Sequence, residues 1–158
     1  MAEGLPVSQA ASEDFLVTAV QQALRIGLDI TEKDIFLAPD PEYFPPDAGD
    51  ICIGIKDGNT DREEDISECL DLTEEIHLCL HVRLPRGETD LSFLITEILS
   101  LEKKIHKILD QNTFELPGYT DAFCDGGKAS KTADRHSARQ TKAIIYKYTK
   151  EQKRESSE

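Results

Sequence analysis

The chain has 158 residues, of which 39% are hydrophobic and 31% are charged, and its formal net charge at pH 7 is −13. This size and composition predict one soluble domain with its own hydrophobic core. The apolar runs are only a few residues long, which excludes a transmembrane helix, and the N-terminal residues lack the basic start and apolar stretch of a secretory signal. We therefore expect a protein that is made and assembled in the cytoplasm.

The N-terminal part of the chain predicts a flexible arm, a helix and a short strand. Residues 1–11 form the arm. Apolar side chains then recur at helical spacing and predict a helix over 13–26, which ends at Gly27. The run 34–38 predicts a short strand that stops at Pro39. The apolar positions of the helix are Phe15, Leu16, Ala19, Val20, Ala23 and Leu24.

Four prolines between positions 39 and 46 exclude both a helix and a central strand over residues 39–50. We expect a stiff, extended segment there, which we call the proline loop. One interpretation is an ordinary connector. The other is a projecting contact loop that presents Tyr43 and Phe44, because exposed aromatic side chains suit a protein interface.

The middle of the chain predicts two strands separated by a polar segment. Residues 51–55 are apolar and bounded by turn signals, which indicates a buried strand. Residues 60–73 are acidic with sparse apolar positions, and we expect a long loop or an edge-strand hairpin. Over 74–84 apolar and polar residues alternate strictly, so one face of this strand is core and the other is polar. The polar face carries Glu75, His77, Cys79, His81 and Arg83.

The C-terminal half predicts one long helix, a second long loop and one strand. Thr89 can cap the helix, and a continuous apolar stripe extends it to about Leu109. Residues 110–138 form the loop. Residues 141–148 alternate as a strand. The apolar residues that share one face of this strand are Ile144, Tyr146 and Tyr148.

These elements predict a single α+β domain over residues 12–150. Its architecture is a two-layer sandwich, in which two main helices pack on one mixed or antiparallel sheet. Long loops are expected at 39–50, 60–73 and 110–138, and residues 151–158 form a polar tail.

The charge is distributed unevenly along the chain. Residues 1–75 carry 19 acidic and 4 basic side chains, whereas residues 128–158 carry 4 acidic and 9 basic ones. A net-negative surface repels phosphate, so the acidic body is a poor ligand for nucleic acid. We expect the basic segment, through Lys142, Lys147 and Lys150, to contact an acidic surface of the adjoining subunit.

Few residues suggest chemistry. His77, Cys79 and His81 share one strand face, but the three span about 13 Å, which is too far for one metal ion. The expected alternative is a polar face that meets solvent or another subunit. Cys124 and His136 could pair as nucleophile and base, but no orienting residue accompanies them.

The four cysteines show no CxxC pair and are expected to be free thiols in a reducing cytoplasm. The segment Asp125-Gly126-Gly127-Lys128 lacks the spacing of a phosphate-binding loop. The sequence therefore predicts no catalytic residue, no metal site and no cofactor, and the protein is not expected to be an enzyme.

The layout resembles a known family. An N-terminal helix, a strand, a proline-rich stretch and the short strand ICIGI precede EEIHLCLHVRLPRGETDLSFLITEILSLEKKIHKIL, an alternating strand that leads into a long amphipathic helix. A long loop and the strand KAIIYKYTKE complete the pattern. Over roughly residues 12–150 this arrangement resembles the tail terminator (tail completion) and related neck proteins of tailed bacteriophages.

The resemblance implies a structural virion protein located in the tail or neck. Such proteins form rings, usually homohexamers, that cap the tail tube and join it to the head connector, while DNA passes through without specific binding. The expected partners are other copies of the chain, the tail tube protein and the connector proteins, with no membrane involved. The residues expected to make these contacts are Tyr43, Phe44, His77, His81, Arg83, Lys142, Lys147 and Lys150.

Three alternatives remain open at the level of sequence. One is another neck or head-completion protein, such as a connector or stopper. The second is an acidic inhibitor that mimics DNA, against which the basic segment argues. The third is a small enzyme, which the absence of a catalytic constellation disfavours.

Overall fold

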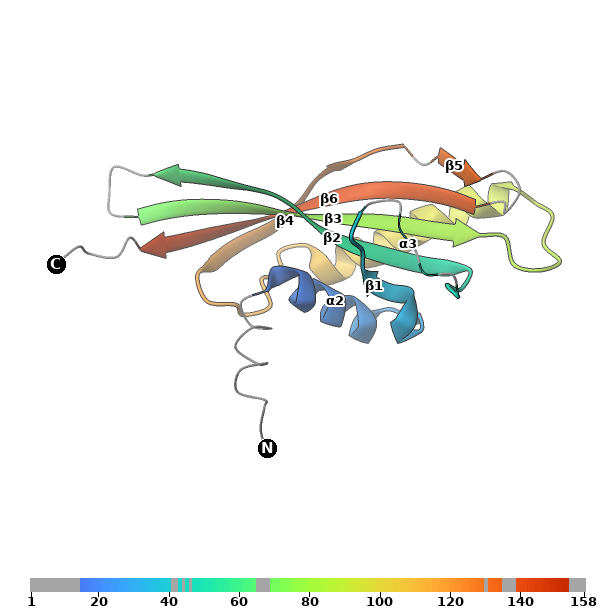
Figure 1. The fold of residues 1–158 in the computed structure, drawn as a ribbon, viewed down its shortest axis with the longest axis horizontal. Helices are drawn as coiled ribbons and strands as arrows, with labels where there is room; N and C mark the ends of the chain where they lie inside the picture. Colours follow the sequence, from blue (N-terminus) through green and yellow to red (C-terminus); the bar gives the residue numbers. More distant parts are fainter. Residues whose placement is uncertain are drawn as a thin grey trace, which may run out of the picture.

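A six-stranded, twisted sheet is the central element of the computed structural model, which describes residues 15–40, 43, 45, 47–64, 69–129, 131–134 and 139–153 (Figure 1). The strands are β1 (Ile35–Leu37), β2 (Ile51–Glu64), β3 (Cys69–Arg83), β4 (Tyr119–Gly127), β5 (Lys131–Asp134) and β6 (Arg139–Lys153). Their order is β1-β2-β3-β6-β4, and β5 also pairs with β6. β1 is parallel to β2 and every other pairing is antiparallel, so the sheet is mixed.

Two helices, α2 (Leu16–Gly27) and α3 (Ser92–Leu109), lie on the same side of this sheet (Figure 1). A 3-10 turn, η1 (Glu32–Asp34), leads from α2 into β1. Gly27 is the last residue of α2, and a Cβ there would come within 2.6 Å of Ile108 Cδ1, so glycine permits the close approach of the helices. The predicted α+β fold, with two helices packed on one mixed sheet, is confirmed.

The core lies between the helices and one face of the sheet. Val20 and Leu24 of α2 meet Ile98 and Ile105 of α3, and all four are completely buried. The sheet contributes alternate residues, because successive side chains of a strand point to opposite faces. The sheet residues whose side chains are at most 3% exposed are Ile53, Ile55, Ile76, Leu78, Leu80, Val82, Ile144, Tyr146 and Tyr148. The predicted alternation over 74–84 and 141–148 is therefore confirmed.

The prediction of a long loop at 60–73 is wrong, and the hairpin alternative holds. β2 and β3 continue as a paired ribbon, with Thr60 opposite Glu74 and Glu64 opposite Leu70. This end of the sheet extends past α2 (Figure 1). With no helix over it, the ribbon does not require the apolar alternation by which a half-buried strand is recognised. A register shift between Asp57 and Thr60 separates it from the rest of β2.

The predicted loop at 110–138 is also corrected, because it contains β4 and β5. Both pair along one side of β6, and β6 itself continues to Lys153, so part of the predicted polar tail at 151–158 is strand. The residues of these strands gain backbone hydrogen bonds from β6, and Ala122 of β4 is part of the core. Among the described residues, no helix is both long and apolar enough to cross a membrane.

Candidate interaction surface

The face of the sheet opposite the helices, here called the open face, is lined by the other set of alternating residues. Three small residues lie directly opposite one another across it: Gly54 of β2, Cys79 of β3 and Ala143 of β6. The next row is formed by Lys56, His77 and Ile145. Because small side chains fill little space, the first row leaves a hollow across the middle of the sheet.

This hollow has a volume of about 420 Å³, and we call it the recess. Two segments border it. On the β1 side lies Ala38, and on the β6 side the segment 125–128 bends over the strand, held by a 2.9 Å hydrogen bond from the Lys128 N–H to the Ala143 carbonyl. Gly126 has φ +122°, a conformation that favours glycine. The recess is lined by Ala38, Gly54, Lys56, His77, Leu78, Cys79, Asp125, Gly126, Gly127, Lys128, Ala143, Ile144 and Ile145.

The histidines predicted for this face have different surroundings. His77 is partly exposed at the recess, and its Nε2 lies 3.1 Å from Glu75 Oε1. His81 lies one row beyond the recess, opposite Cys52 and Thr141, and is only 3% exposed. Burial, together with the nearby Arg139 charge, lowers the pKa of His81 to about 4. On the open face, therefore, His77 is accessible to solvent whereas His81 is buried.

Elemental analysis of the purified protein should show no stoichiometric zinc. Alternate residues on a strand lie about 7 Å apart, and His77 and His81 lie on opposite sides of Cys79 in rows of different burial. Among the described residues no group of three or more potential ligands converges. One zinc per chain that withstands dialysis against a weak chelator would contradict this prediction.

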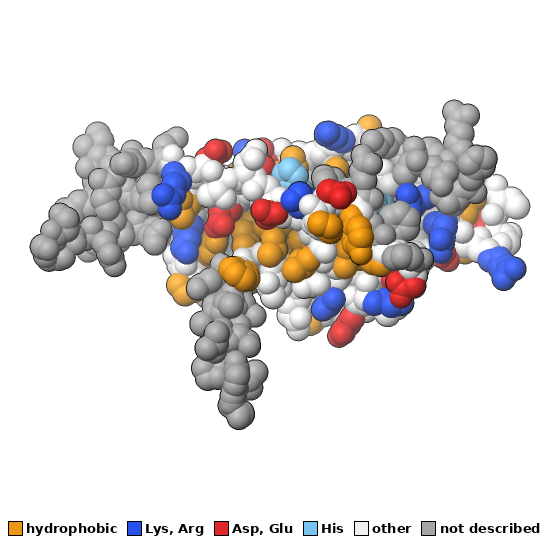
Figure 2. Space-filling view, in the orientation of Figure 1, with side chains coloured by type: hydrophobic (Ala, Val, Ile, Leu, Met, Phe, Trp, Pro, Cys, Tyr) orange, Lys and Arg blue, Asp and Glu red, His pale blue; other side chains and the backbone are white. Residues whose placement is uncertain are grey.

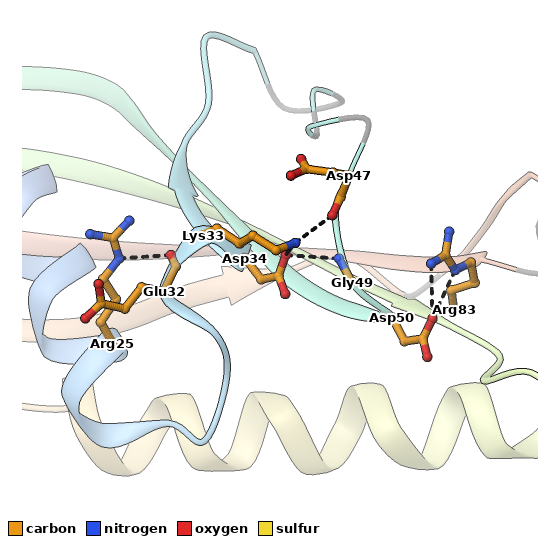
Figure 3. Close-up of polar contacts among 8 residues, drawn as sticks. All are labelled: Arg25, Glu32, Lys33, Asp34, Asp47, Gly49, Asp50 and Arg83. Atoms are coloured by element: carbon orange, nitrogen blue, oxygen red, sulfur yellow. Dashed lines mark hydrogen bonds and ion pairs between the residues drawn. The ribbon is translucent and has the colours of Figure 1, made fainter.

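Arg83 lies at the end of the open face and contacts the start of β2. Its Nε and Nη2 donate to Asp50 Oδ1 at 3.2 and 3.1 Å, and both side chains are about two-fifths exposed. An exposed pair of this kind contributes little to stability. Arg83 therefore stays accessible at the surface, next to the end of the proline loop (Figure 3).

The three lysines predicted to contact another subunit each have a partner within the chain. Lys142 Nζ lies 2.6 Å from Glu102 Oε1 of α3, on the helix side of the sheet. On the open face, Lys147 Nζ lies 3.0 Å from Asp125 Oδ2. Lys150 Nζ lies 5.1 Å from the centroid of the Tyr119 ring. Their contact with an adjoining subunit stays a prediction.

The proline loop is fastened to the body at its C-terminal end (Figure 3). Lys33 Nζ donates to the Asp47 carbonyl at 2.6 Å, and the Gly49 N–H donates to Asp34 Oδ1 at 3.0 Å. Tyr43 is 40% exposed, and its ring meets the Phe36 ring edge-on with centroids 5.8 Å apart. The other predicted contact residue, Phe44, lies outside the described residues.

Exposed apolar side chains accompany this loop. On the side of the molecule drawn in Figure 2, hydrophobic side chains form a band across the middle, with acidic and basic side chains along its borders. Leu37 of β1 is 46% exposed, close to the value for Tyr43. Large apolar side chains at a surface suggest a protein partner when they occur together rather than singly.

A partly buried polar network that the sequence does not predict joins the C-terminal part of α3 to β6. The Tyr146 hydroxyl donates to Asp110 Oδ1 at 2.7 Å and lies 2.5 Å from His106 Nδ1. His106 Nε2 lies 3.3 Å from Glu102, which also binds Lys142. Burial, and then the Asp110 hydrogen bond, raise the pKa of Tyr146. The spacing of Glu102, His106 and Asp110 by four residues is the signal that could have revealed one polar edge of α3.

The candidate nucleophile has no base among the described residues. Cys124 Sγ lies 3.5 Å from the Gly126 carbonyl, and His136 lies outside the described residues. Burial raises the pKa of the Cys52 thiol to about 12, which keeps that thiol protonated.

Comparison with known proteins bears on the fold. No protein-family model and no curated protein matches the chain. The chain does match 28 chains of solved structures. One belongs to a structure described as "Virion of native gene transfer agent (GTA) particle", with a TM-score of 0.56 and 14% sequence identity over 87% of this chain and 95% of that chain. At this identity the likeness shows the fold alone: the chain has the fold of one component of that virion.

Proposed function

We propose that this chain is a structural protein of a phage-like virion and, more specifically, its tail terminator. In this role a ring of copies, most simply a hexamer, caps the tail tube and joins it to the head connector. The observation that carries the proposal is the shared fold with a virion component, which extends over almost the whole of both chains. No step of catalysis is part of the function.

The edges of the sheet support self-assembly. One edge of β2 pairs with β3, and the other pairs with β1 only at Ile53–Ile55. Among the described residues, no strand pairs with this outer edge of β2 beyond Ile55. On the opposite edge lies β4, where the Gln111 N–H caps the Ala122 carbonyl. Unpaired strand edges readily accept a strand from another molecule.

The two edges are level and run in opposite directions. Asp61 of β2 lies opposite Thr73 of β3, Thr73 lies opposite Thr149 of β6, and Thr149 lies opposite Asp121 of β4, so these four residues form one row across the sheet. A copy rotated about an axis parallel to the strands would therefore place its β2 antiparallel to the β4 of its neighbour. Such a contact joins two different surfaces, and repeated by rotation it closes into a ring.

The acidic balance suits a channel for DNA. Outside its basic C-terminal segment the chain is strongly negative, and a negative wall does not hold phosphate. DNA can then pass without specific binding.

Removal of the gene from a producing strain tests the proposal. We expect filled heads and assembled tails that remain unjoined, or tails of uncontrolled length, and restoration of normal particles when the gene is supplied in trans. Purified protein added to isolated tails should bind them as a ring, which native mass and electron microscopy can measure. Binding to filled heads instead would indicate a connector or stopper. Normal, joined particles without this protein would refute the assignment.

A further inference from the structure

The recess on the open face is a hollow of about 420 Å³ whose floor is formed by small residues. We propose that it receives the proline loop (residues 39–50) of a second copy of the chain. This inference rests on the self-assembly proposed above and identifies one contact through which it occurs.

The shape of the recess suits an inserted side chain. Its floor is made of Gly54, Cys79 and Ala143, so the walls stand above it on both sides. Its volume of about 420 Å³ falls in the range of roughly 300–1,000 Å³ that is typical of binding pockets. A floor of small apolar residues favours an aromatic or aliphatic side chain at the bottom of the recess, while the walls also carry the charged residues Lys56, Asp125 and Lys128.

The described part of the proline loop is held beside β1. Hydrogen bonds from Lys33 and to Asp34 fasten it beside β1, at Asp47 and Gly49. The Tyr43 ring packs on Phe36, which forms a small cluster with Ala38 and Cys52 at the border of the recess. None of the described loop residues Tyr43, Asp47 and Gly49 is among the residues that line the recess.

An exposed lysine, Lys128, lies at the mouth of the recess. Its backbone N–H donates to the Ala143 carbonyl, which places the Lys128 backbone beside the floor of the recess. The other charges at the mouth are already balanced within the chain. Lys56 lies 3.2 Å from Asp57, and Asp125 lies 3.0 Å from Lys147.

The proline loop has the opposite chemistry. Asp40, Glu42 and Asp47 surround the aromatic pair Tyr43-Phe44, and the segment contains no basic residue. An aromatic side chain in the recess would bring these carboxylates towards Lys128. Prolines keep the loop stiff, which reduces the conformational entropy lost when it binds. Apolar fit and charge therefore favour the same occupant.

A peptide with the sequence of residues 38–49 tests the recess directly. It is titrated into the ¹⁵N-labelled full chain, at concentrations where the native mass is that of a monomer. We expect saturable shifts of the amide signals of Gly54, Cys79, Ala143 and Lys128. A peptide with serine at both aromatic positions should bind at least about tenfold more weakly, because buried aromatic anchors dominate such contacts.

Two protein variants sharpen this test. Ala143→Leu fills the recess and should weaken binding of the peptide by about tenfold or more. Thr96→Leu adds the same side chain on the exposed side of α3 and should leave the affinity for the peptide unchanged. Thermal unfolding of both variants shows whether they fold. Lys128→Glu should weaken binding most at low salt.

Cross-linking in the assembled protein separates this inference from the proposed function. A photoreactive phenylalanine analogue replaces Tyr43, and labelled and unlabelled chains are mixed. Links from one copy to residues 125–128 or 143–145 of another would support the contact. A ring whose links map elsewhere would overturn the contact and leave the proposed function standing. A chain that binds the peptide in the recess but never assembles would overturn the ring and support the recess as the site of the loop.

Discussion

Lys142→Glu should lower the free energy of unfolding by about 3 kcal/mol, because it replaces a largely buried ion pair by two adjacent carboxylates. Lys142 and Glu102 are only 16% and 18% exposed, and their charged atoms lie 2.6 Å apart. Burial alone would raise the pKa of Glu102, but Lys142 and His106 together lower it, so this carboxyl is held ionised by its partners. Urea unfolding at pH 7 measures the loss.

Two controls show whether the pair is the cause. The exchanged pair, Lys142→Glu with Glu102→Lys, should recover at least half of the lost stability. Lys103→Glu makes the same change in net charge on the exposed side of α3 and should alter the free energy of unfolding by no more than about 0.5 kcal/mol. Equal losses for Lys142→Glu and Lys103→Glu would contradict the assignment. The comparison also matters for assembly, since a ring lost in Lys142→Glu would report a damaged subunit rather than a lost contact.

Acidification from pH 6.5 to pH 4 should destabilise the protein by about 3 kcal/mol through His81 alone. In the unfolded chain this imidazole has its ordinary pKa of 6.5, while in the folded protein the pKa is about 4. Between these values the unfolded chain binds a proton that the folded protein does not. The contribution of His81 is therefore fully present above pH 6.5 and is lost as pH falls towards 4.

The pH window distinguishes His81 from the carboxylates. The partners of Glu75 and Glu102 lower the pKa of each carboxyl below its ordinary 4.5, so their contributions are lost only at lower pH. His81→Gln should remove the slope between pH 6.5 and 4, whereas His77→Gln, a matched change two rows away on the same strand face, should keep it. A wild-type stability that stays flat from pH 7 to pH 5 would rule this account out.

Strong periodicity made part of the fold predictable. Leu78, Leu80 and Val82 alternate with polar residues, and the apolar stripe of α3 repeats over five turns, so one face of each element had to be buried. The sheet and its two helices followed from these patterns. The ribbon at 60–73 escaped the same reasoning because backbone pairing between β2 and β3, rather than side-chain burial, holds it together.

The surface was less predictable than the core. Tyr43 could be singled out because prolines surround it, but the recess depends on the register that places Gly54, Cys79 and Ala143 side by side. These residues are far apart in the sequence, and a one-residue change in register would have moved each to the other face. The partners of Lys142 and Tyr146 in α3 were hidden for the same reason: they are more than thirty residues away.

The position of β6 between β3 and β4 governs how quickly the subunit can form. β2 and β3 are close in the sequence and can pair locally, whereas β6 must return across about 55 residues to reach β3. Closing so long a segment makes this step slow. Until it happens, β3 has an uncovered edge in the middle of the future sheet, where strands of other molecules can pair wrongly. Refolding rate, more than final stability, should therefore limit the yield of correctly formed subunits, and dilution should raise that yield.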